Sequence, residues 1–395
     1  MLHPLRNAIQ PYDWGSTTAV AELMGRPPTG EPEAEVWMGA HPKAPSQVCV
    51  DGRWLPLGDH IASDPSAVLG DAVVARFGPT LPFLLKILAA AQPLSLQVHP
   101  TVAQAESGYD AEEARGVALG APERTYRDRN HKPELLAALG PFEALAGFRT
   151  ATDAADVLDA LGAGDPWVAR LRAGELDGVF WDLWALDGDE RRELVDKVVD
   201  GAARAGERYA AEAGLVARCA ELHPGDVGIV VALLLNRVHL DATEAIYAPA
   251  GRLHAYLDGL GVEIMASSDN VVRGGLTTKH VDLDELRRIL TVRPEAIEPL
   301  RPAADGTADG EAVYATPAPE FRLSRLEIGG DAALTVEGPE IVLCTQGSVS
   351  ARPGSDGSGG MSLGAGESAF VDAAARAYVL GGSGVVFRAT VGELG

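Results

Sequence analysis

The sequence has few of the features that mark secreted, membrane-spanning or disulfide-stabilised proteins. Its 395 residues include only 3 cysteines. These lie far apart and form no CxxC pair, so we expect reduced thiols and no disulfide framework. The longest apolar run, Val227–Leu235, is far too short to span a membrane. Residues 1–6 show no signal-peptide pattern. Together these absences favour a cytoplasmic protein.

Positive charge is also scarce. Lys and Arg number 33 against 56 Asp and Glu, which gives a formal net charge of −23. This balance argues against nucleic acid or an anionic membrane as the main partner. An anionic substrate would need a local cluster of lysine and arginine working against the overall charge. No segment has the pattern of an obligate subunit interface, so we expect a monomer.

A chain of this length is expected to form two or three domains. Residues 1–150 combine proline, glycine and tryptophan with short apolar runs, which predicts β-structure with long connections. Residues 151–222 are rich in alanine, leucine and charged residues, which predicts a helical insert. Residues 223–300 return to the β-like pattern. The segment 301–311, rich in Pro, Asp and Gly, marks a boundary before the short strands predicted for residues 301–395.

Apolar residues of the insert recur with the spacing of an amphipathic helix, most clearly at Leu194, Val195 and Val198. The insert could serve as a lid or a partner surface, although packing support is the simpler interpretation. A shorter helix is predicted over residues 284–290.

Chemically useful residues first appear in the run Pro93–Pro100. Leucine and valine alternate there with Ser95, Gln97 and His99, which is the period of a strand, so these three polar side chains are predicted to share one face. A Gln carbonyl beside a His imidazole is a reasonable half of a divalent metal site. The alternative is a solvated strand face.

Two later segments supply matching groups. Pro133 favours an extended backbone at Lys132, so Lys132 and Glu134 are predicted to face the same way, either as a site or as a surface ion pair. His254 follows a glycine-containing turn at the start of an apolar strand. Gln97, His99, Glu134 and His254 would form a nitrogen and oxygen ligand set that suits zinc with an open position.

A polar segment over residues 263–280 adds Glu263, Asp269, Arg273 and Lys279 among small residues that leave room for a ligand. The alternative is a polar turn between strands.

Several of these segments, in this order, resemble the type I phosphomannose isomerases. The resemblance rests on PYDWGS at residues 11–16, AEVWMGAHP at 34–42, LSLQVHP at 94–100, NHKPE at 130–134 and most of residues 250–282. It covers about residues 7 to 290.

The resemblance implies a mainly β fold with a helical insert. A jelly-roll cupin catalytic domain would comprise residues 1–150 and 223–300, with an α-helical domain at 151–222. Residues 301–395 would form a second cupin-like β-domain without metal residues, because all nine histidines lie at or before His280.

The resemblance also implies the reaction and its residues. The family consists of zinc-dependent isomerases that interconvert mannose 6-phosphate and fructose 6-phosphate and supply GDP-mannose metabolism. One zinc ion per chain is expected on the four ligands named above. The implied catalytic residues are Arg273, Glu263, Lys132, His131 and Asp269. The residues expected to hold the sugar phosphate are Ser95, Lys86 and Lys279, although Lys86 could be an ordinary surface lysine.

The proton-transfer base could be Glu263 or Lys132, and His131 could assist ring opening. Glu263 is favoured mildly, because a carboxylate needs the smaller pKa shift. Three other functions stay open: an isomerase of another sugar phosphate or a free aldose, a metal-containing sugar-binding protein without turnover, and an iron oxygenase. The oxygenase is disfavoured by Gln97 as an additional ligand.

Overall fold

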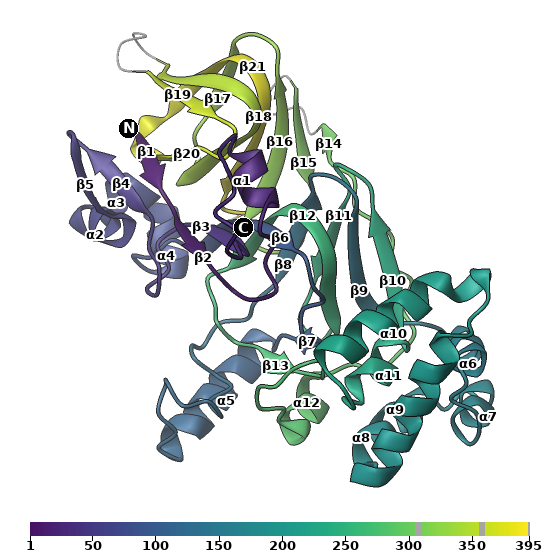
Figure 1. Cartoon of the computed structure of the whole chain (residues 1–395). Helices are drawn as coiled ribbons and strands as arrows, with labels where there is room; N and C mark the ends of the chain where they lie inside the picture. Colours follow the sequence, from purple (N-terminus) through teal and green to yellow (C-terminus); the bar gives the residue numbers. More distant parts are fainter. Residues whose placement is uncertain (305–309, 355–359, 394–395) are drawn as a thin grey trace.

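The computed structural model describes residues 1–304, 310–354 and 360–393 and consists mainly of antiparallel β-sheet, as predicted (Figure 1). The first sheet has ten strands among the described residues. They are β2 (Ala8–Gln10), β3 (Glu35–Met38), β6 (Phe83–Ala90), β7 (Gln97–Val98), β8 (Glu134–Ala138), β9 (Phe142–Phe148), β10 (Leu235–Leu240), β11 (Ala245–Ala248), β12 (His254–Ala266) and β13 (Val272–Arg273).

The second sheet has eleven strands in the same described ranges. They are β1 (Leu2–Arg6), β4 (Gln47–Val50), β5 (Arg53–Pro56), β14 (Ala303–Ala304), β15 (Glu311–Tyr314), β16 (Arg322–Ile328), β17 (Ala332–Thr335), β18 (Glu340–Pro353), β19 (Met361–Gly364), β20 (Ser368–Val371) and β21 (Ala377–Thr390).

The second sheet crosses the domain division predicted from the sequence. Strand β1 pairs with β20, so that Leu2 lies opposite Val371, and β4 and β5 continue from β1. The N-terminal strands β1, β4 and β5 therefore belong to the C-terminal sheet, and not to a unit formed by residues 1–150. The predicted boundary segment 301–311 is described only in part, because residues 305–309 lie outside the described residues.

The two sheets share one apolar core. Ile87 and Val262 of the first sheet belong to the same buried cluster as Leu323 and Phe387 of the second. Burial of such side chains contributes roughly 1.5–3 kcal/mol each. The shared core gives the first sheet a rigid backing, which positions the polar side chains on its other face.

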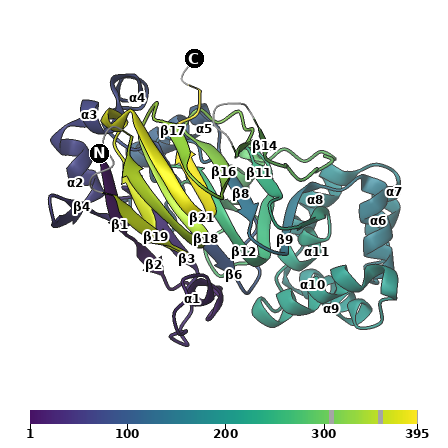
Figure 2. The same cartoon turned by 90° about the horizontal axis from the view of Figure 1, so that it is seen from above.

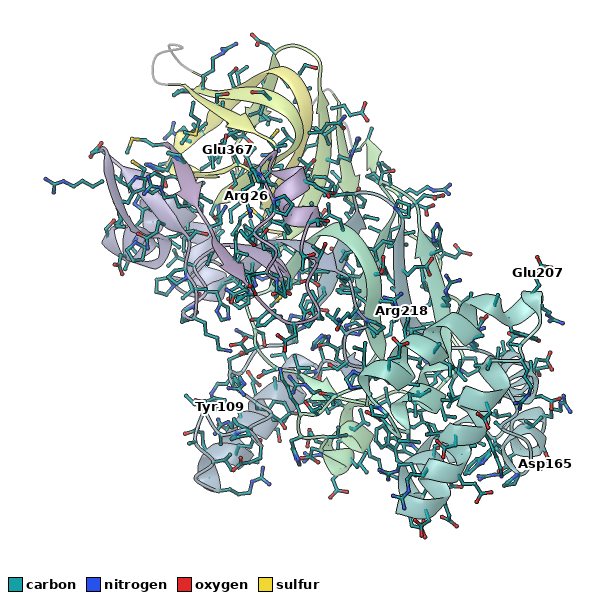
Figure 3. All side chains as sticks on the ribbon, in the orientation of Figure 1. Arg26, Tyr109, Asp165, Glu207, Arg218 and Glu367 are labelled. Atoms are coloured by element: carbon teal, nitrogen blue, oxygen red, sulfur yellow. The ribbon has the colours of Figure 1, made fainter. Side chains whose placement is uncertain are left out.

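Helices fill the segment where an insert was predicted. They are α6 (Ala151–Ala160), α7 (Trp167–Arg172), α8 (Leu176–Ala185), α9 (Gly188–Ala202), the 3₁₀ helix η1 (Glu207–Tyr209) and α10 (Ala210–Leu222). A further helix, α11 (Gly228–Ala232), lies beyond the insert, in the segment that was predicted to return to β-structure. Figure 2 shows this group at one end of the molecule, away from β18 and β21. The predicted stripe is confirmed, since Leu194, Val195 and Val198 are buried. Arg218 of α10 (Figure 3) donates to the carbonyl oxygen of Leu257 at 3.0 Å and so ties the helices to β12.

Other helices were missed by the sequence pattern. They are α1 (Ala19–Leu23), α2 (Leu57–Ser63), α3 (Pro65–Leu69), α4 (Asp71–Phe77) and α5 (Val102–Ala114). The first four have only 5–7 residues each and lie in segments rich in proline and glycine, which favoured loops. The last is mostly exposed and begins with a capping box formed by Thr101 and Gln104. The short helix predicted near residue 284 is confirmed as α12 (Leu283–Ile289). No helix in the described part of the chain is long and apolar enough to cross a membrane.

Close packing within the helical segment leads to a stability prediction. A Cβ atom on Gly201 of α9 would lie 2.0 Å from the carbonyl oxygen of Leu161, whereas one on Gly214 of α10 would meet nothing within 4 Å. Gly201→Ala is expected to lower the free energy of unfolding by roughly 1–3 kcal/mol through overpacking. The control Gly214→Ala should raise it by up to about 1 kcal/mol, since alanine favours a helix. Urea unfolding followed by circular dichroism measures both, and equal stability of the two variants would contradict the packing.

Candidate active site

A cavity of about 440 Å³ opens on the polar face of the first sheet. Nine of the twelve residues singled out from the sequence line it: Lys86, Ser95, Gln97, Lys132, Glu134, Glu263, Asp269, Arg273 and Lys279. His99 and His254 lie buried behind Glu134, and His131 lies elsewhere. The structure thus gathers residues from five separate segments of the chain.

Strand register explains how these side chains meet. Lys86 of β6 is directly opposite Glu263 of β12, and Glu134 of β8 is opposite Met265. Gln97 of β7 lies opposite both His254 and Arg273 on its two neighbours. Residues directly opposite on paired strands have their Cβ atoms about 4.5–5.5 Å apart, so each pair can interact.

An irregularity in β12 lets residues from both halves of this strand contribute side chains to the same site. His254 and Glu263 are an odd number of residues apart, so in a regular strand they would face opposite sides. The register of β12 against β9 shifts between Tyr256 and Asp258. Beyond the shift, Glu263 and Met265 line the same cavity as Tyr256. Such irregularities often redirect side chains beside active sites.

His99, Glu134 and His254 form a buried cluster whose candidate ligand atoms all lie within 4.8 Å of one another. Glu134 Oε2 is 3.1 Å from His254 Nε2 and 3.4 Å from His99 Nε2. Gln97 lines the cavity beside them as the register partner of His254. The cluster could hold a divalent cation.

The hydrogen bonds of the imidazoles fit a metal. His99 Nδ1 is 2.8 Å from the carbonyl oxygen of Asn270, and His254 Nδ1 is 3.1 Å from that of Arg252. In the tautomer with the proton on Nδ1, each imidazole donates to its carbonyl and leaves the Nε2 lone pair directed toward the Glu134 carboxylate. His99 Nε2 is buried and has no hydrogen-bond partner among the described residues. A cation between these atoms would satisfy all three, and backbone carbonyls commonly orient metal-binding histidines in this way.

The protonation states of His99 and Glu134 also suit a metal site. Burial lowers the pKa of His99 to about 4, so this imidazole is neutral at pH 7, as a metal ligand must be. Burial alone would raise the pKa of Glu134, but the neighbouring Lys132 and His99 hold it well below its usual range. Lys132 is buried and donates to Glu134 Oε1. The prediction that Lys132 and Glu134 face the same way is confirmed, and the surface ion pair is excluded.

Asn270 holds the cluster together, and sequence reasoning missed it. It is fully buried, its side-chain oxygen accepts from Arg127 N at 2.7 Å, and its side-chain nitrogen donates to the carbonyl oxygens of Asp128 and Asn130 at 2.8 Å. It therefore fixes the loop that precedes Glu134 while its own carbonyl orients His99. An Asn amid polar residues gave no sequence signal for this role.

Lys86 is buried between two carboxylates. Its Nζ lies 2.8 Å from Glu263 and 3.3 Å from Glu35, and Glu35 accepts from Trp37 Nε1 at 2.6 Å. Burial alone would lower the pKa of Lys86, but the two carboxylates raise it above its ordinary value. Burial raises the pKa of Glu263. The surface-lysine interpretation is wrong, and Lys86 is engaged in ion pairs.

Positive charge collects at another part of the cavity. Arg273 and Lys279 line it, and within the described residues neither has an ion-pair partner at 4.0 Å or less. Burial and the nearby Arg127 lower the pKa of Arg273. Burial, Arg273, Arg127 and Lys43 likewise lower the pKa of Lys279. Uncompensated cations so close together suit a dianionic group.

Asp269 is engaged at the cavity wall. Its Oδ2 lies 2.8 Å from Lys43 Nζ and 3.4 Å from His41 Nε2. Burial alone would raise the pKa of Asp269, but these two partners hold it below its usual range. Asp269 therefore stays ionised and anchors Lys43 beside the cationic end.

Tyr256 is a second residue that sequence reasoning missed. It lines the cavity, is buried, and its hydroxyl has no hydrogen-bond partner among the described residues. Burial raises its pKa well above the ordinary value, so the hydroxyl keeps its proton. An unpartnered buried donor of this kind can bind a ligand oxygen. Its alternation with His254 along the strand was the available signal.

His131 does not join the cavity. Its Nε2 lies 2.8 Å from Glu320 Oε1, and it lines a separate cavity with Asn130 and Ser267. The cause is the extended backbone that turns Lys132 inward, because the preceding side chain then points the opposite way. Its predicted part in ring opening is not supported by this placement.

Known proteins resemble this chain in both sequence and structure. A family profile, phosphomannose isomerase type I, catalytic domain, matches residues 2–151. The mannose-6-phosphate isomerase of Escherichia coli strain K12 is 37% identical over 398 residues, covering 98% of this chain and 99% of the relative. The human enzyme of that name is 32% identical over 385 residues and 88% of both chains.

Solved structures agree over nearly the whole chain. A zinc-bound mannose 6-phosphate isomerase superposes with a TM-score of 0.90 at 35% identity, covering 99% of this chain and 100% of that structure. The enzyme of Salmonella typhimurium, solved with its substrate fructose 6-phosphate and a zinc atom, gives the same TM-score, identity and coverage.

Proposed function

Because this chain belongs to the type I phosphomannose isomerase family, we propose that it interconverts D-mannose 6-phosphate and D-fructose 6-phosphate with the help of zinc. The observation that carries the proposal is the placement of the His99–Glu134–His254 cluster at the back of a cavity whose other end is cationic. One end suits the metal and the other suits the phosphate.

Gln97, His99, Glu134 and His254 are the proposed zinc ligands. Zinc bound there would polarise a substrate oxygen and so favour negative charge on it. His99 and His254 are held by backbone carbonyls, and Glu134 by Lys132, so the ligand set is organised before the ion arrives.

Aldose–ketose isomerisation moves a proton between C2 and C1 through an enediol, which requires one base within reach of both carbons. Glu263 is the proposed base, since burial raises the pKa of its carboxyl above the ordinary value. Lys86 is the proposed positioning residue, which holds that carboxylate at 2.8 Å. Arg273, beside Gln97, stabilises the charge that develops on oxygen, and Tyr256 donates to a substrate oxygen.

The phosphate is proposed to bind at Lys279 and Ser95. This differs from the sequence-based assignment in one respect, because Lys86 is already paired with two carboxylates. The local cations also meet the requirement set by the net charge of −23, which would otherwise repel a sugar phosphate.

Lys279→Gln should raise KM for mannose 6-phosphate by roughly 10–100-fold while changing kcat little, since a hydrogen bond to a charged group contributes about 1.5–3 kcal/mol. Steady-state kinetics measure this. The control Lys197→Gln removes an exposed lysine of α9 that pairs with Glu193 and should leave KM unchanged. An unchanged KM in Lys279→Gln would contradict its role in phosphate binding.

The architecture that we propose has two cupin-type barrels and a helical unit. The metal-bearing barrel would be formed by the first sheet, and the second barrel by the C-terminal strands with β1, β4 and β5. Residues 151–222 would form the helical unit.

The proposed reaction is tested with purified protein given mannose 6-phosphate, glucose 6-phosphate or free mannose, with ketose formation followed in a coupled assay. Turnover of mannose 6-phosphate at least 100-fold above the other two is the expected result. A preference for either of the others would overturn the assignment of mannose 6-phosphate as the substrate.

A further inference from the structure

A second cluster of histidine and carboxylate lies outside the active site. His3 of β1, His60 of α2 and Asp372, which follows β20, are 4%, 7% and 5% exposed, and their candidate ligand atoms lie within 4.8 Å of one another. Strands β1 and β20 lie far from β7 and β13 (Figure 1). Within the described residues this is the one such cluster besides His99–Glu134–His254.

The contacts within this cluster are short and shared. Asp372 Oδ2 lies 3.0 Å from His3 Nε2, and Asp372 Oδ1 lies 2.8 Å from His60 Nε2. The two imidazole rings are 4.9 Å apart between centroids. A single carboxylate therefore joins two imidazoles that come from distant parts of the chain.

A neutral imidazole cannot make both of the hydrogen bonds that the position of His3 suggests. Its Nδ1 lies 3.1 Å from the carbonyl oxygen of Cys49, while its Nε2 faces the Asp372 carboxylate. A neutral imidazole has only one N–H, so either tautomer would set a nitrogen lone pair against an oxygen lone pair. Two arrangements resolve the conflict: an imidazolium that donates from both nitrogens, or a cation bound at Nε2.

The same pattern recurs at the active-site cluster. There His254 has Nδ1 on the carbonyl of Arg252 at 3.1 Å and Nε2 at 3.1 Å from the shared carboxylate of Glu134. Both clusters thus consist of two imidazoles and one carboxylate, with a backbone carbonyl holding the far nitrogen of a histidine.

From this correspondence we propose that His3, His60 and Asp372 form a second binding site for zinc or a similar first-row divalent cation. Two nitrogens and one carboxylate oxygen suit such ions and leave a position for a further ligand. The proposal departs from the expectation that residues 301–395 hold no metal residues, because Asp372 lies beside two histidines from the N-terminal part of the chain.

The ion would stabilise the fold and would take no part in catalysis. It would connect β1, α2 and the end of β20, whose residues lie up to 369 positions apart. The amino group of Met1 also lies 3.0 Å from Asp372 Oδ2, on the solvent side. Among the described residues it is the one charged group besides the two histidines that contacts Asp372, and it would compete with the ion for this carboxylate oxygen.

Zinc stoichiometry tests the proposal on protein made without an N-terminal tag, so that Met1 is native. The protein is stripped with a chelator, incubated with zinc chloride, desalted and analysed by plasma mass spectrometry. We expect two zinc ions per chain in the wild type, one in His60→Gln, one in Glu134→Gln and none in the double variant. His60→Gln should keep its isomerase activity within twofold. The control His239→Gln removes an exposed histidine paired with Glu143 and should still bind two.

One zinc ion in the wild type and none in Glu134→Gln would overturn the site and leave an imidazolium–carboxylate triad. Anomalous diffraction from wild-type crystals above and below the zinc edge does not depend on any variant folding. A peak between His3, His60 and Asp372 supports the site, and a peak at Glu134 alone overturns it.

Discussion

Glu134→Gln is expected to remove zinc from the active site and to lower turnover by roughly 1,000-fold or more, since a metal ion contributes several kcal/mol and each 1.4 kcal/mol is tenfold. Glu134 is the carboxylate that both imidazoles face, at 3.1 and 3.4 Å. The amide keeps its size but loses the charge that attracts the cation and that Lys132 balances. Metal analysis and the coupled assay on the same sample measure both losses.

The matched control is Glu143→Gln. Glu143 also contacts a histidine, His239 at 2.7 Å, but it lies on β9 away from the cavity. It should retain full turnover. A Glu134→Gln protein that binds zinc at this site and keeps a tenth of wild-type turnover would contradict the assignment of the ligand.

Glu263→Gln should lower kcat by roughly 100–10,000-fold, the range typical of a positioned general base. Zinc content should not change, because Glu263 is separate from the ligand cluster. Its pKa is raised by burial, so the wild type should lose activity as the pH falls through that pKa and the carboxylate gains a proton. The variant has no such group, and its residual activity should lack this acidic limb.

Glu35→Gln is the control that distinguishes the loss of the proposed base from a disturbance of the ion pairs around Lys86. Glu35 is the second carboxylate on Lys86, at 3.3 Å, so this variant disturbs the same ion pair without removing the proposed base. A loss of less than tenfold is expected. Solvent deuterium incorporation into the sugar during turnover gives a second readout, and it should fall in Glu263→Gln only. Equal losses in the two variants would show that the ion pair matters and the base does not.

Much of the site could be predicted because alternation along short strands decides which side chains share a face. Leu96 and Val98 are fully buried while Ser95 and Gln97 line the cavity, as the pattern of Pro93–Pro100 indicated. The regular strand there, β7 (Gln97–Val98), is only two residues long and ends before His99. The alternation therefore predicted correctly which side chains face the cavity, although the regular strand is shorter than predicted.

Tertiary arrangement accounts for what sequence reasoning missed. The register shift after Tyr256, which lets Glu263 share a cavity with that tyrosine, leaves no sequence signal. Likewise, nothing local shows that β1 pairs with β20, so the sequence offered no reason to separate residues 1–6 from the rest of residues 1–150. The contact between His3 and Asp372 spans 369 positions, and no spacing motif describes it.

The central claim is a zinc-dependent isomerase, and chelation followed by metal readdition tests it most directly. Purified wild-type protein is assayed for fructose 6-phosphate formation from mannose 6-phosphate before treatment, after removal of metal, and after zinc chloride is returned. Turnover should disappear with the metal and return with zinc. Full turnover in protein shown by metal analysis to be free of zinc, or no turnover in the zinc-loaded protein, would contradict the claim.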